Sequence, residues 1–273
     1  MTGIMKRIFK GIVRAVRCAP VQIPVYVPVL QSELLKGRTA LVTGGGGGIG
    51  YAIAEAFLSA GAKVVISGRN EEKLKEAASK LSSKGDVSFV QMDNTLPASF
   101  GAALSKVTAF DILVNNAGYV GGGSFGNTQE SEYDKVMNTN LKGAYFLSQA
   151  VSKLWIQNGT RGNILNICSA SSLRPGQSPY ILSKWGLRAL TVGMAKSLIT
   201  HGIVVNGLAP GCTNTQKFSP NGDIYNSHNP SGRMVTVEEI ANMAVILVSS
   251  LSRMIVGDVV YMTGGGAITT LDD

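Results

Sequence analysis

A tyrosine and a lysine four residues apart, Tyr180 and Lys184, form the pair with the most direct chemical use in this chain of 273 residues. Residues at this spacing project from the same face of an α-helix. A lysine ammonium beside a tyrosine stabilises the phenolate, so the phenol becomes a usable general acid and base. By itself, the pair would be better explained as a surface contact between the two side chains, because this spacing occurs by chance in many helices.

Further polar side chains stand at the ends of segments with strand patterns. Ser169 ends one such segment, and the pair Asn115 and Asn116 ends another. Ligands of open α/β sheets bind outside the carboxyl ends of the strands, so these residues are candidates for ligand contact. We prefer Ser169 to the serines that follow because it ends its strand directly. Asn140 lies within a helical stretch, where an amide competes with the backbone for hydrogen bonds.

A glycine-rich turn begins at Thr43, and residues 43–50 read Thr-Gly-Gly-Gly-Gly-Gly-Ile-Gly. It precedes a helical stripe made of Ile49, Ala52, Ile53, Ala56, Phe57 and Ala60. Glycines let the backbone approach a pyrophosphate, and a helix N-terminus offers it free N–H groups and a positive dipole end. A flexible linker is the alternative, but the tight flanking by strand and helix patterns favours dinucleotide binding.

Strand and helix patterns alternate from residue 37 onward. The predicted strands are 39–43, 63–67, 87–91, 112–115, 163–167, 204–208 and 259–262. The predicted helices are 50–60, 71–82, 97–107, 129–157, 179–200 and 236–250. Strict alternation predicts a parallel sheet with helices on both faces. We therefore expect an α/β, Rossmann-type doubly wound sheet of about seven strands, folded as one domain over residues 37–273.

Residues 1–36 are expected to form an extension of that domain. Apolar residues within 4–16 fall on one helical face and basic residues on the other, which predicts a short basic amphipathic helix at 4–17. Such a helix can anchor a protein peripherally to a membrane, or its apolar stripe can pack on the protein itself or a neighbouring subunit. The segment that follows is apolar and carries Pro20, Pro24 and Pro28, which indicates an extended strap.

Composition and charge exclude several other classes. Hydrophobic residues make up 45% of the chain, as in a globular protein with a large core. Five basic residues within the first 17 supply most of the net charge of +8, and the rest shows no basic stripe with interleaved aromatics. Nucleic acid is therefore not an expected partner. No run reaches the roughly 18 to 20 apolar residues of a membrane span, and no secretory signal pattern is present.

The cysteines and histidines are too few and too scattered for a metal centre. The chain has three cysteines, Cys18, Cys168 and Cys212, without CxxC spacing, and two histidines. No metal site is expected. An odd number of cysteines fits reducing conditions, so we expect a cytoplasmic protein, with membrane association as an option through the N-terminal extension.

Taken together, these segments resemble the short-chain dehydrogenase/reductase family, in the single-domain branch of the 3-oxoacyl-acyl-carrier-protein reductases. The resemblance covers about residue 37 to the C-terminus. The TGxxxGxG turn of the family is matched by Thr43, Gly44, Gly48 and Gly50, and its NNAG motif by residues 115–118. Its active-site asparagine, serine and YxxxK pair are matched by Asn140, Ser169, Tyr180 and Lys184, and its PG motif by Pro210 and Gly211.

The resemblance implies hydride transfer between a nicotinamide ring and a carbonyl or secondary alcohol. Tyr180 would exchange the substrate proton, and Lys184 would support Tyr180 and bind the nicotinamide ribose. Ser169 would hold the substrate oxygen, and Asn140 would support a water-linked proton relay. The positions expected to contact the cofactor are Gly44, Gly48, Ile49, Gly50, Arg69, Asp93, Asn116, Ala117, Gly118, Tyr180, Lys184, Pro210, Gly211 and Thr215.

The end of the second predicted strand favours NADP(H) over NAD(H). An NAD-selective site would place a carboxylate there to bind the ribose hydroxyls, and none occurs between residues 63 and 70. Arg69 instead offers a planar cation to a 2′-phosphate. The alternative is a solvated arginine ahead of a helix. Asp93 resembles the adenine contact of the family.

The segment 212–233 is expected to form the substrate lid, since loops at strand ends carry specificity. Its side chains are mostly polar, which predicts a small polar or sugar-like substrate. The chain departs from the family in a slightly short interval between Ser169 and Tyr180 and in a run of glycines at 45–47. It also departs at Cys168, where we expect a small buried residue and keep a redox thiol as the alternative.

Two other functions stay open. One is a non-catalytic nucleotide-binding sensor or scaffold, against which the complete set of Asn140, Ser169, Tyr180 and Lys184 argues. The other is a sugar-modifying enzyme such as an epimerase or dehydratase, which usually has a TGxxGxxG turn and a larger C-terminal substrate domain. By analogy with the family we expect a homodimer or homotetramer, formed through the helices at 129–157 and 179–200.

Overall fold

The computed structural model of this chain describes residues 31–107, 109–215, 221 and 223–266. The chain divides into two units, Met1–Leu30 and Gln31–Asp273, and every described residue belongs to the second. The predicted helix at 4–17 and the proline-rich strap lie outside the described residues. The predicted domain boundary at residue 37 stays a prediction. In the described part of the chain, no helix is long and apolar enough to cross a bilayer.

Seven parallel strands form one sheet in the order β3-β2-β1-β4-β5-β6-β7. Their bounds are Thr39–Thr43 (β1), Lys63–Gly68 (β2), Val87–Gln91 (β3), Ile112–Asn115 (β4), Asn163–Ile167 (β5), Val204–Pro210 (β6) and Val259–Met262 (β7). The predicted sheet is confirmed, and β2 and β6 run slightly further than expected. Central strands of a parallel sheet are buried on both faces, so their apolar runs were readable from the sequence.

The helices also follow the prediction, with two interruptions. Their bounds are Gly48–Ser59 (α2), Glu71–Leu81 (α3), Phe100–Leu104 (α4), Glu130–Met137 (α5), Gly143–Asn158 (α6), Pro179–Leu198 (α7) and Val237–Val248 (α8). The single helix expected at 129–157 is divided by the π-helical turn Asn138–Lys142. The helix expected at 97–107 is α4 preceded by the 3₁₀ turn Pro97–Ser99.

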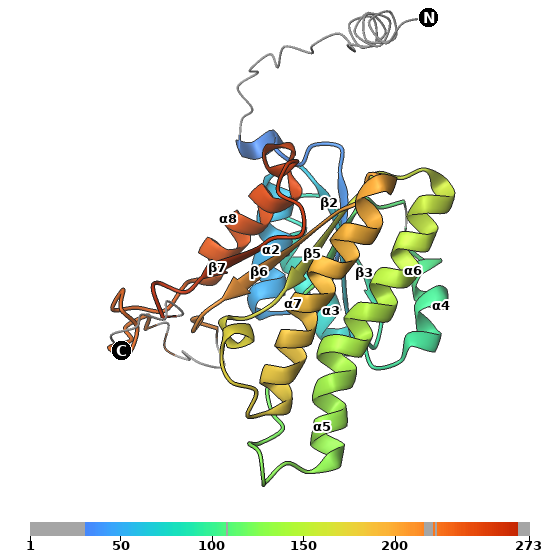
Figure 1. Ribbon diagram of the computed structural model, residues 1–273. Helices are drawn as coiled ribbons and strands as arrows, with labels where there is room; N and C mark the ends of the chain where they lie inside the picture. Colours follow the sequence, from blue (N-terminus) through green and yellow to red (C-terminus); the bar gives the residue numbers. More distant parts are fainter. Residues whose placement is uncertain (1–30, 108, 216–220, 222, 267–273) are drawn as a thin grey trace, which may run out of the picture. The chain divides into compact units, whose positions relative to one another are not determined.

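Helices cover both faces of the sheet (Figure 1). On one face α2 packs beside α8, where Ile53, Phe57 and Ile240 are fully buried. On the other face α6 and α7 lie beside each other, and Leu147 and Trp155 of α6 fill the core beneath them. Each such side chain stabilises the fold by roughly 1.5–3 kcal/mol through burial, so the sheet is held rigidly from both sides.

The strand order reverses between β1 and β4, because the chain returns from β3 at the sheet edge to place β4 beside β1. Open α/β sheets bind ligands at such a switch point, outside the carboxyl ends of the strands. The glycine turn follows β1, and Asn116 follows β4. The topology therefore brings the first glycine motif and the NNAG motif to the same place.

Candidate active site

Helix α7 carries Tyr180 and Lys184 one turn apart. The helix begins at Pro179, and its N-cap Ser178 accepts a hydrogen bond from the Ile181 N–H at 3.3 Å. The Lys184 ammonium lies 5.8 Å from the centroid of the Tyr180 ring. The Lys184 residue is 5% exposed, and its ammonium donates to the carbonyl oxygen of Ile167, the last residue of β5, at 2.8 Å. This contact fixes the helix against the end of the strand that leads to Ser169.

Ser169 follows β5 by two residues and begins the 3₁₀ turn Ala170–Leu173. Its Oγ accepts a hydrogen bond from the Ser171 N–H at 3.1 Å. One lone pair of the hydroxyl is therefore used within the turn, and its hydrogen remains available to a further acceptor. The strand ends at Ile167, and Cys168 and Ser169 continue from it toward α7.

Asn140 lies within the π-helical turn and is 1% exposed. Its Oδ1 accepts from the Tyr119 N–H at 2.7 Å, and its Nδ2 donates to the Tyr119 carbonyl and to the Ser183 hydroxyl, both at 3.0 Å. A Cβ added at Gly118 would lie 3.5 Å from Asn140 Oδ1 and 4.0 Å from Lys184 Nζ. Asn140 and Lys184 thus approach the same point of the backbone, although they are distant in sequence.

Thr43 and Asn116 hold the glycine turn in its shape. The Thr43 hydroxyl accepts from the Asn116 N–H at 2.9 Å, and the Asn116 Nδ2 donates to the Thr43 carbonyl at 2.8 Å. Gly44 has a φ of 67°, which favours glycine. A Cβ added at Gly50 would collide with the Gly44 carbonyl oxygen and the Asn116 amide. The first and last glycines of the motif are therefore required by the turn itself.

The N-terminus of α2 fits a pyrophosphate. Gly47 is its N-cap and makes no side-chain hydrogen bond, whereas the N-caps of α3, α7 and α8 each accept one through a side chain. A helix start without a side-chain cap leaves N–H groups for an anion. A Cβ added at Gly47 would meet no atom within 4 Å, so the backbone is open to a ligand there.

Arg69 and Asp93 lie together in a hollow beyond the ends of β2 and β3. The hollow has a volume of about 360 Å³ and is also lined by Gln91, Leu96 and Lys106. The Gln91 Nε2 donates to the Arg69 carbonyl at 2.9 Å, which fixes the backbone of that residue. Asp93 Oδ1 accepts from the backbone N–H and the hydroxyl of Thr95, both at 2.8 Å. Two carboxylates, Glu71 and Glu72, line the neighbouring hollow with Arg69.

The PG motif brings the base of the lid to the glycine turn. Pro210 ends β6, and the Gly211 N–H donates to the Met262 carbonyl at 2.9 Å. Thr215 lies close to the turn, since a Cβ added at Gly48 would come 3.8 Å from its methyl group. Tyr180 and Lys184 lie on α7, beside the end of β5, and the other predicted cofactor positions lie at or follow the carboxyl ends of β1, β2, β3, β4 and β6.

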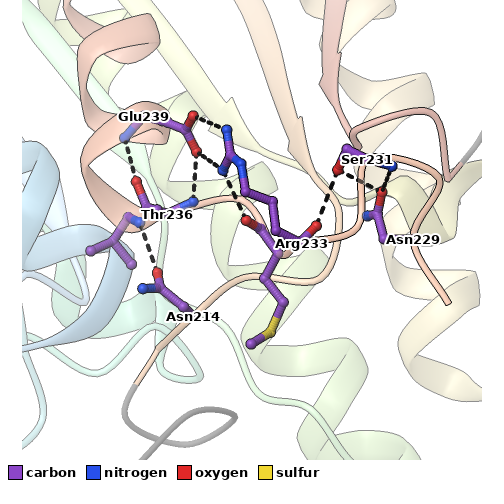
Figure 2. Close-up of polar contacts among 8 residues, drawn as sticks. Asn214, Asn229, Ser231, Arg233, Thr236 and Glu239 are labelled. Carbon is purple, nitrogen blue, oxygen red and sulfur yellow. Dashed lines mark hydrogen bonds and ion pairs between the residues drawn. The ribbon is translucent and has the colours of Figure 1, made fainter. Parts of the chain in front are cut away.

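Arg233, at the end of the segment 212–233 that is predicted to form the lid, is bound to the start of α8 (Figure 2). Its Nη1 and Nη2 contact Glu239 Oε2 and Oε1 at 2.9 Å and 2.7 Å. Glu239 also forms a capping box with Thr236, whose N–H donates to Oε2 at 2.9 Å. The hydrogen bonds from Arg233 and then from the Thr236 backbone lower the pKa of Glu239 to about 2.

The lid is also held at the end of β7. Asn229 Nδ2 donates to the Thr263 carbonyl at 2.9 Å, and the Ser231 N–H donates to the Gly264 carbonyl at 3.0 Å. Asn214, near the other end of the lid, accepts from the Val237 N–H at 3.2 Å, as Figure 2 shows. Residues 216–220 and 222 of the lid lie outside the described residues.

Cys168 is a small buried residue. It is 3% exposed and packs with Ala144, Leu187, Ala209 and Val259. Burial raises the pKa of the Cys168 thiol, which disfavours the reactive thiolate. The redox alternative considered from the sequence therefore loses its chemical basis.

Sequence reasoning missed Tyr119 and Ser183, the partners of Asn140. Both stand beside residues of the recognised motifs: Tyr119 follows Gly118, and Ser183 precedes Lys184. The Tyr119 hydroxyl donates to Glu132 Oε2 at 3.0 Å. Adjacency to a motif residue was the available signal, but only the tertiary contacts identify these partners.

Comparisons with known proteins agree with this geometry. A model of the short chain dehydrogenase family matches residues 38–223. A gluconate 5-dehydrogenase of Gluconobacter oxydans (strain 621H) is 36% identical over 247 residues, covering 85% of this chain and 95% of the relative. A 3-oxoacyl-acyl-carrier-protein reductase of Rickettsia felis is 34% identical over 237 residues, covering 85% and 97%.

A solved structure shares both the fold and its extent. A gluconate 5-dehydrogenase from Burkholderia cenocepacia J2315, crystallised in complex with NADP and tartrate, superposes with a TM-score of 0.80 at 33% identity. The match covers 88% of this chain and 99% of that chain. The resemblance drawn from the motifs is confirmed.

Proposed function

The chain belongs to the short-chain dehydrogenase family of nicotinamide-dependent oxidoreductases, and on that premise we propose that it transfers a hydride between NADP(H) and a carbonyl or secondary alcohol at the site around Tyr180. The placement of Lys184 carries this proposal. Its ammonium lies one helical turn from Tyr180 and donates to Ile167, two residues before Ser169. The buried Lys184 ammonium therefore fixes the helix that carries Tyr180 against the end of the strand that leads to Ser169.

In the direction of reduction, a bound nicotinamide supplies a hydride to the carbonyl carbon. Tyr180 donates its phenolic proton to the substrate oxygen, and the Lys184 ammonium stabilises the phenolate that remains. The Ser169 Oγ accepts a hydrogen bond from the Ser171 N–H. Its own hydrogen is therefore the one that it donates to the same substrate oxygen. Alcohol oxidation runs through the same groups in reverse.

Asn140 serves a proton relay to Lys184 through its backbone. Both hydrogens of its side-chain amide are used by Tyr119 and Ser183, so the side chain has no donor left for water. The backbone carbonyl oxygen of Asn140, carried in the π-helical turn, is the acceptor that we assign to a water-linked relay. π-helical turns inside α-helices frequently mark functional sites.

The cofactor is NADP(H). The similar gluconate 5-dehydrogenase of known structure holds NADP, and Arg69 stands here at the end of β2 as a cation for the 2′-phosphate. The uncapped start of α2 receives the pyrophosphate. Glu71 and Glu72 beside Arg69 oppose a phosphate, so selectivity depends on the arginine.

The substrate is small and polar, of the hydroxy-acid or sugar-acid class. The support is the polar lid and the relatives named gluconate 5-dehydrogenase, one of them solved with tartrate. A 3-oxoacyl-acyl-carrier-protein reductase is 34% identical to this chain. The turnover assay therefore includes 3-oxoacyl thioesters as a second substrate class. The described part of the predicted lid is not wholly polar, since it contains the large apolar residues Ile224 and Tyr225.

A second copy of the chain covers the outer face of α6 and α7. Large apolar side chains that are 39–51% exposed gather on these two helices: Tyr145, Phe146, Ile156, Leu182, Trp185 and Val192. Sedimentation velocity tests the oligomer, and a monomer at micromolar concentration contradicts it.

Peripheral membrane contact through residues 4–17 stays a proposal, tested by liposome sedimentation of the full chain against a version that starts at Gly37.

Turnover assays test the proposed function. The purified chain is supplied with polyhydroxy acids, their keto forms and 3-oxoacyl thioesters, each with NADPH or NADH, and the reduced dinucleotide is followed by absorbance. We expect turnover of a polar acid with a clear preference for the phosphorylated dinucleotide. Preference for NADH contradicts the cofactor proposal, preference for acyl thioesters contradicts the substrate class, and binding without turnover favours a sensor or scaffold.

A further inference from the structure

The turn that carries Ser169 needs anchors from outside itself. It is a single 3₁₀ turn, Ala170–Leu173, closed by backbone bonds from Ser172 to Ser169 at 2.9 Å and from Arg174 to Ser171 at 3.1 Å. A catalytic hydroxyl must be held within about 0.5 Å of its productive position. Hydrogen bonds within the turn do not by themselves define its position relative to Tyr180, which lies on another element.

Helix α7 provides several of these anchors. Lys184 donates to Ile167 before the turn, and the Trp185 Nε1 donates to the Arg174 carbonyl at 2.7 Å after it. Arg188 Nη1 reaches the Ser172 carbonyl at 3.4 Å. All three come from the helix that also carries Tyr180. They therefore hold the two flanks of the turn against α7.

One anchor comes from a different element, strand β7. The Tyr261 hydroxyl lies 3.0 Å from Ser172 Oγ, and Ser172 Oγ in turn donates to the Ser169 carbonyl at 2.7 Å. A carbonyl can only accept, so the Ser172 hydrogen is committed to Ser169 and Tyr261 must be the donor to Ser172. Ser172 is fully buried. The result is a directed chain of two hydroxyls that ends on the backbone of Ser169.

The same end of β7 also holds the lid. Thr263 and Gly264, just beyond the strand, accept the hydrogen bonds from Asn229 and Ser231. Tyr261 itself lines a cavity of about 550 Å³ together with Leu173, Arg233 and Met234. The phenol therefore stands where the lid, the end of β7 and the Ser169 turn meet.

We infer that Tyr261 is a positioning residue for Ser169: its hydroxyl, acting through Ser172, sets the place of the Ser169 turn and ties it to the strand that holds the lid. The inference rests on the proposed function, in which Ser169 binds the substrate oxygen. Hydroxyls that donate in series polarise one another and strengthen the chain. Loss of the first donor loosens the turn without emptying the core, because Tyr261→Phe removes one oxygen atom.

Steady-state kinetics on a set of variants test this inference. Tyr261→Phe should lower kcat by about 3- to 30-fold, as small misplacements of catalytic groups do, and leave the dissociation constant of NADPH unchanged. In a Ser172→Ala or a Ser169→Ala background, the same substitution should change kcat by no more than about 2-fold, since residues that act through one another are not additive. Tyr133→Phe, on α5, is the matched control and should behave as the wild type.

The outcomes separate this inference from the proposed function. An unchanged kcat in Tyr261→Phe, while Ser169→Ala is impaired, overturns the positioning role and leaves the proposed function standing. An equal loss from Tyr261→Phe in the Ser169→Ala background also overturns it, because the phenol would then act elsewhere. Full activity of Ser169→Ala contradicts the proposed role of the serine itself.

Amide hydrogen exchange tests, without any substrate, whether Tyr261 anchors the Ser169 turn. In Tyr261→Phe, peptides covering 169–174 should exchange faster than in the wild type, while peptides of α2 and α6 keep their rates. Unchanged exchange at 169–174 overturns the inference. Faster exchange throughout the protein overturns it as well, because the hydroxyl would then serve general stability.

Discussion

The ammonium of Lys184 lies 5.8 Å from the ring centroid of Tyr180 and donates to the carbonyl oxygen of Ile167 at 2.8 Å. The same group therefore belongs both to the helix of the proposed acid and to the strand end of the proposed substrate-binding serine. At 5% exposure its position is set by the fold and not by solvent. Preorganisation of this kind is what electrostatic catalysis requires.

Tyr180→Phe should reduce kcat by about 10²- to 10⁴-fold, the range expected for loss of a general acid and base. The dissociation constant of NADPH should remain that of the wild type, since the aromatic ring is kept. Stopped-flow or steady-state turnover and fluorescence titration measure the two quantities. Tyr133→Phe on α5 is the control, and residual activity above a tenth of the wild type would exclude Tyr180 as the acid.

Gly50→Ala and Gly47→Ala should differ sharply although both add one methyl group to the same turn. The Cβ at Gly50 collides with the Gly44 carbonyl and the Asn116 amide, and overpacking of this kind costs about 1–3 kcal/mol. Gly47 has open space and an extended φ of 173°, which any residue adopts. Urea unfolding and NADPH titration should show losses for Gly50→Ala only. Equal effects would contradict the geometry of the turn.

Gly47→Arg should tighten NADPH binding by roughly tenfold through a charge-assisted contact with phosphate. Its backbone is already extended, and no atom lies within 4 Å of the added Cβ. Gly47→Gln controls for side-chain length, and the gain should shrink as salt is added. Arg69→Gln should act in the opposite direction, weakening NADPH but not NADH. An unchanged NADPH affinity in both variants would remove the basis for NADP(H) selectivity.

The ion pair of Glu239 and Arg233 should stabilise the protein in a defined pH range. The pKa of Glu239 falls from 4.5 to about 2 on folding, so its contribution is fully present above pH 4.5 and is lost as the pH falls through 2. Both side chains are about 40% exposed, at 44% and 39%, so the effect is small and weakened by salt. Unfolding curves of Glu239→Gln and wild type should differ above pH 4.5 and converge near pH 2.

The Glu239→Gln variant isolates the charge, because its amide oxygen can still accept from the Thr236 N–H in the capping box. Thr236→Ala, which removes the other half of the box, should cost about 1 kcal/mol. That loss should be nearly independent of pH. A difference between Glu239→Gln and the wild type that persists at pH 2 would mean that packing, and not charge, fastens the end of the lid.

Most strands and helices could be predicted because their patterns are local. The apolar runs of β1 and β4 and the periodic stripe of α2 depend on neighbours within a few residues. The division of the helix at 129–157 could not be predicted in this way. Its π-helical turn accompanies the hydrogen bonds of Asn140 to Tyr119 and Ser183, which lie 21 and 43 residues away. No local pattern encodes such partners.

The sequence by itself determined the family, the glycine turn and the residue types of the site, since spacing such as that of Tyr180 and Lys184 is a property of one helix. Only the tertiary structure decided how these pieces meet. Thr43 and Asn116 are 73 residues apart, and Ser172 and Tyr261 are 89 apart. Parallel strands bring such distant residues to one edge of the sheet, and hydrogen bonds between them depend on positions that no single segment specifies.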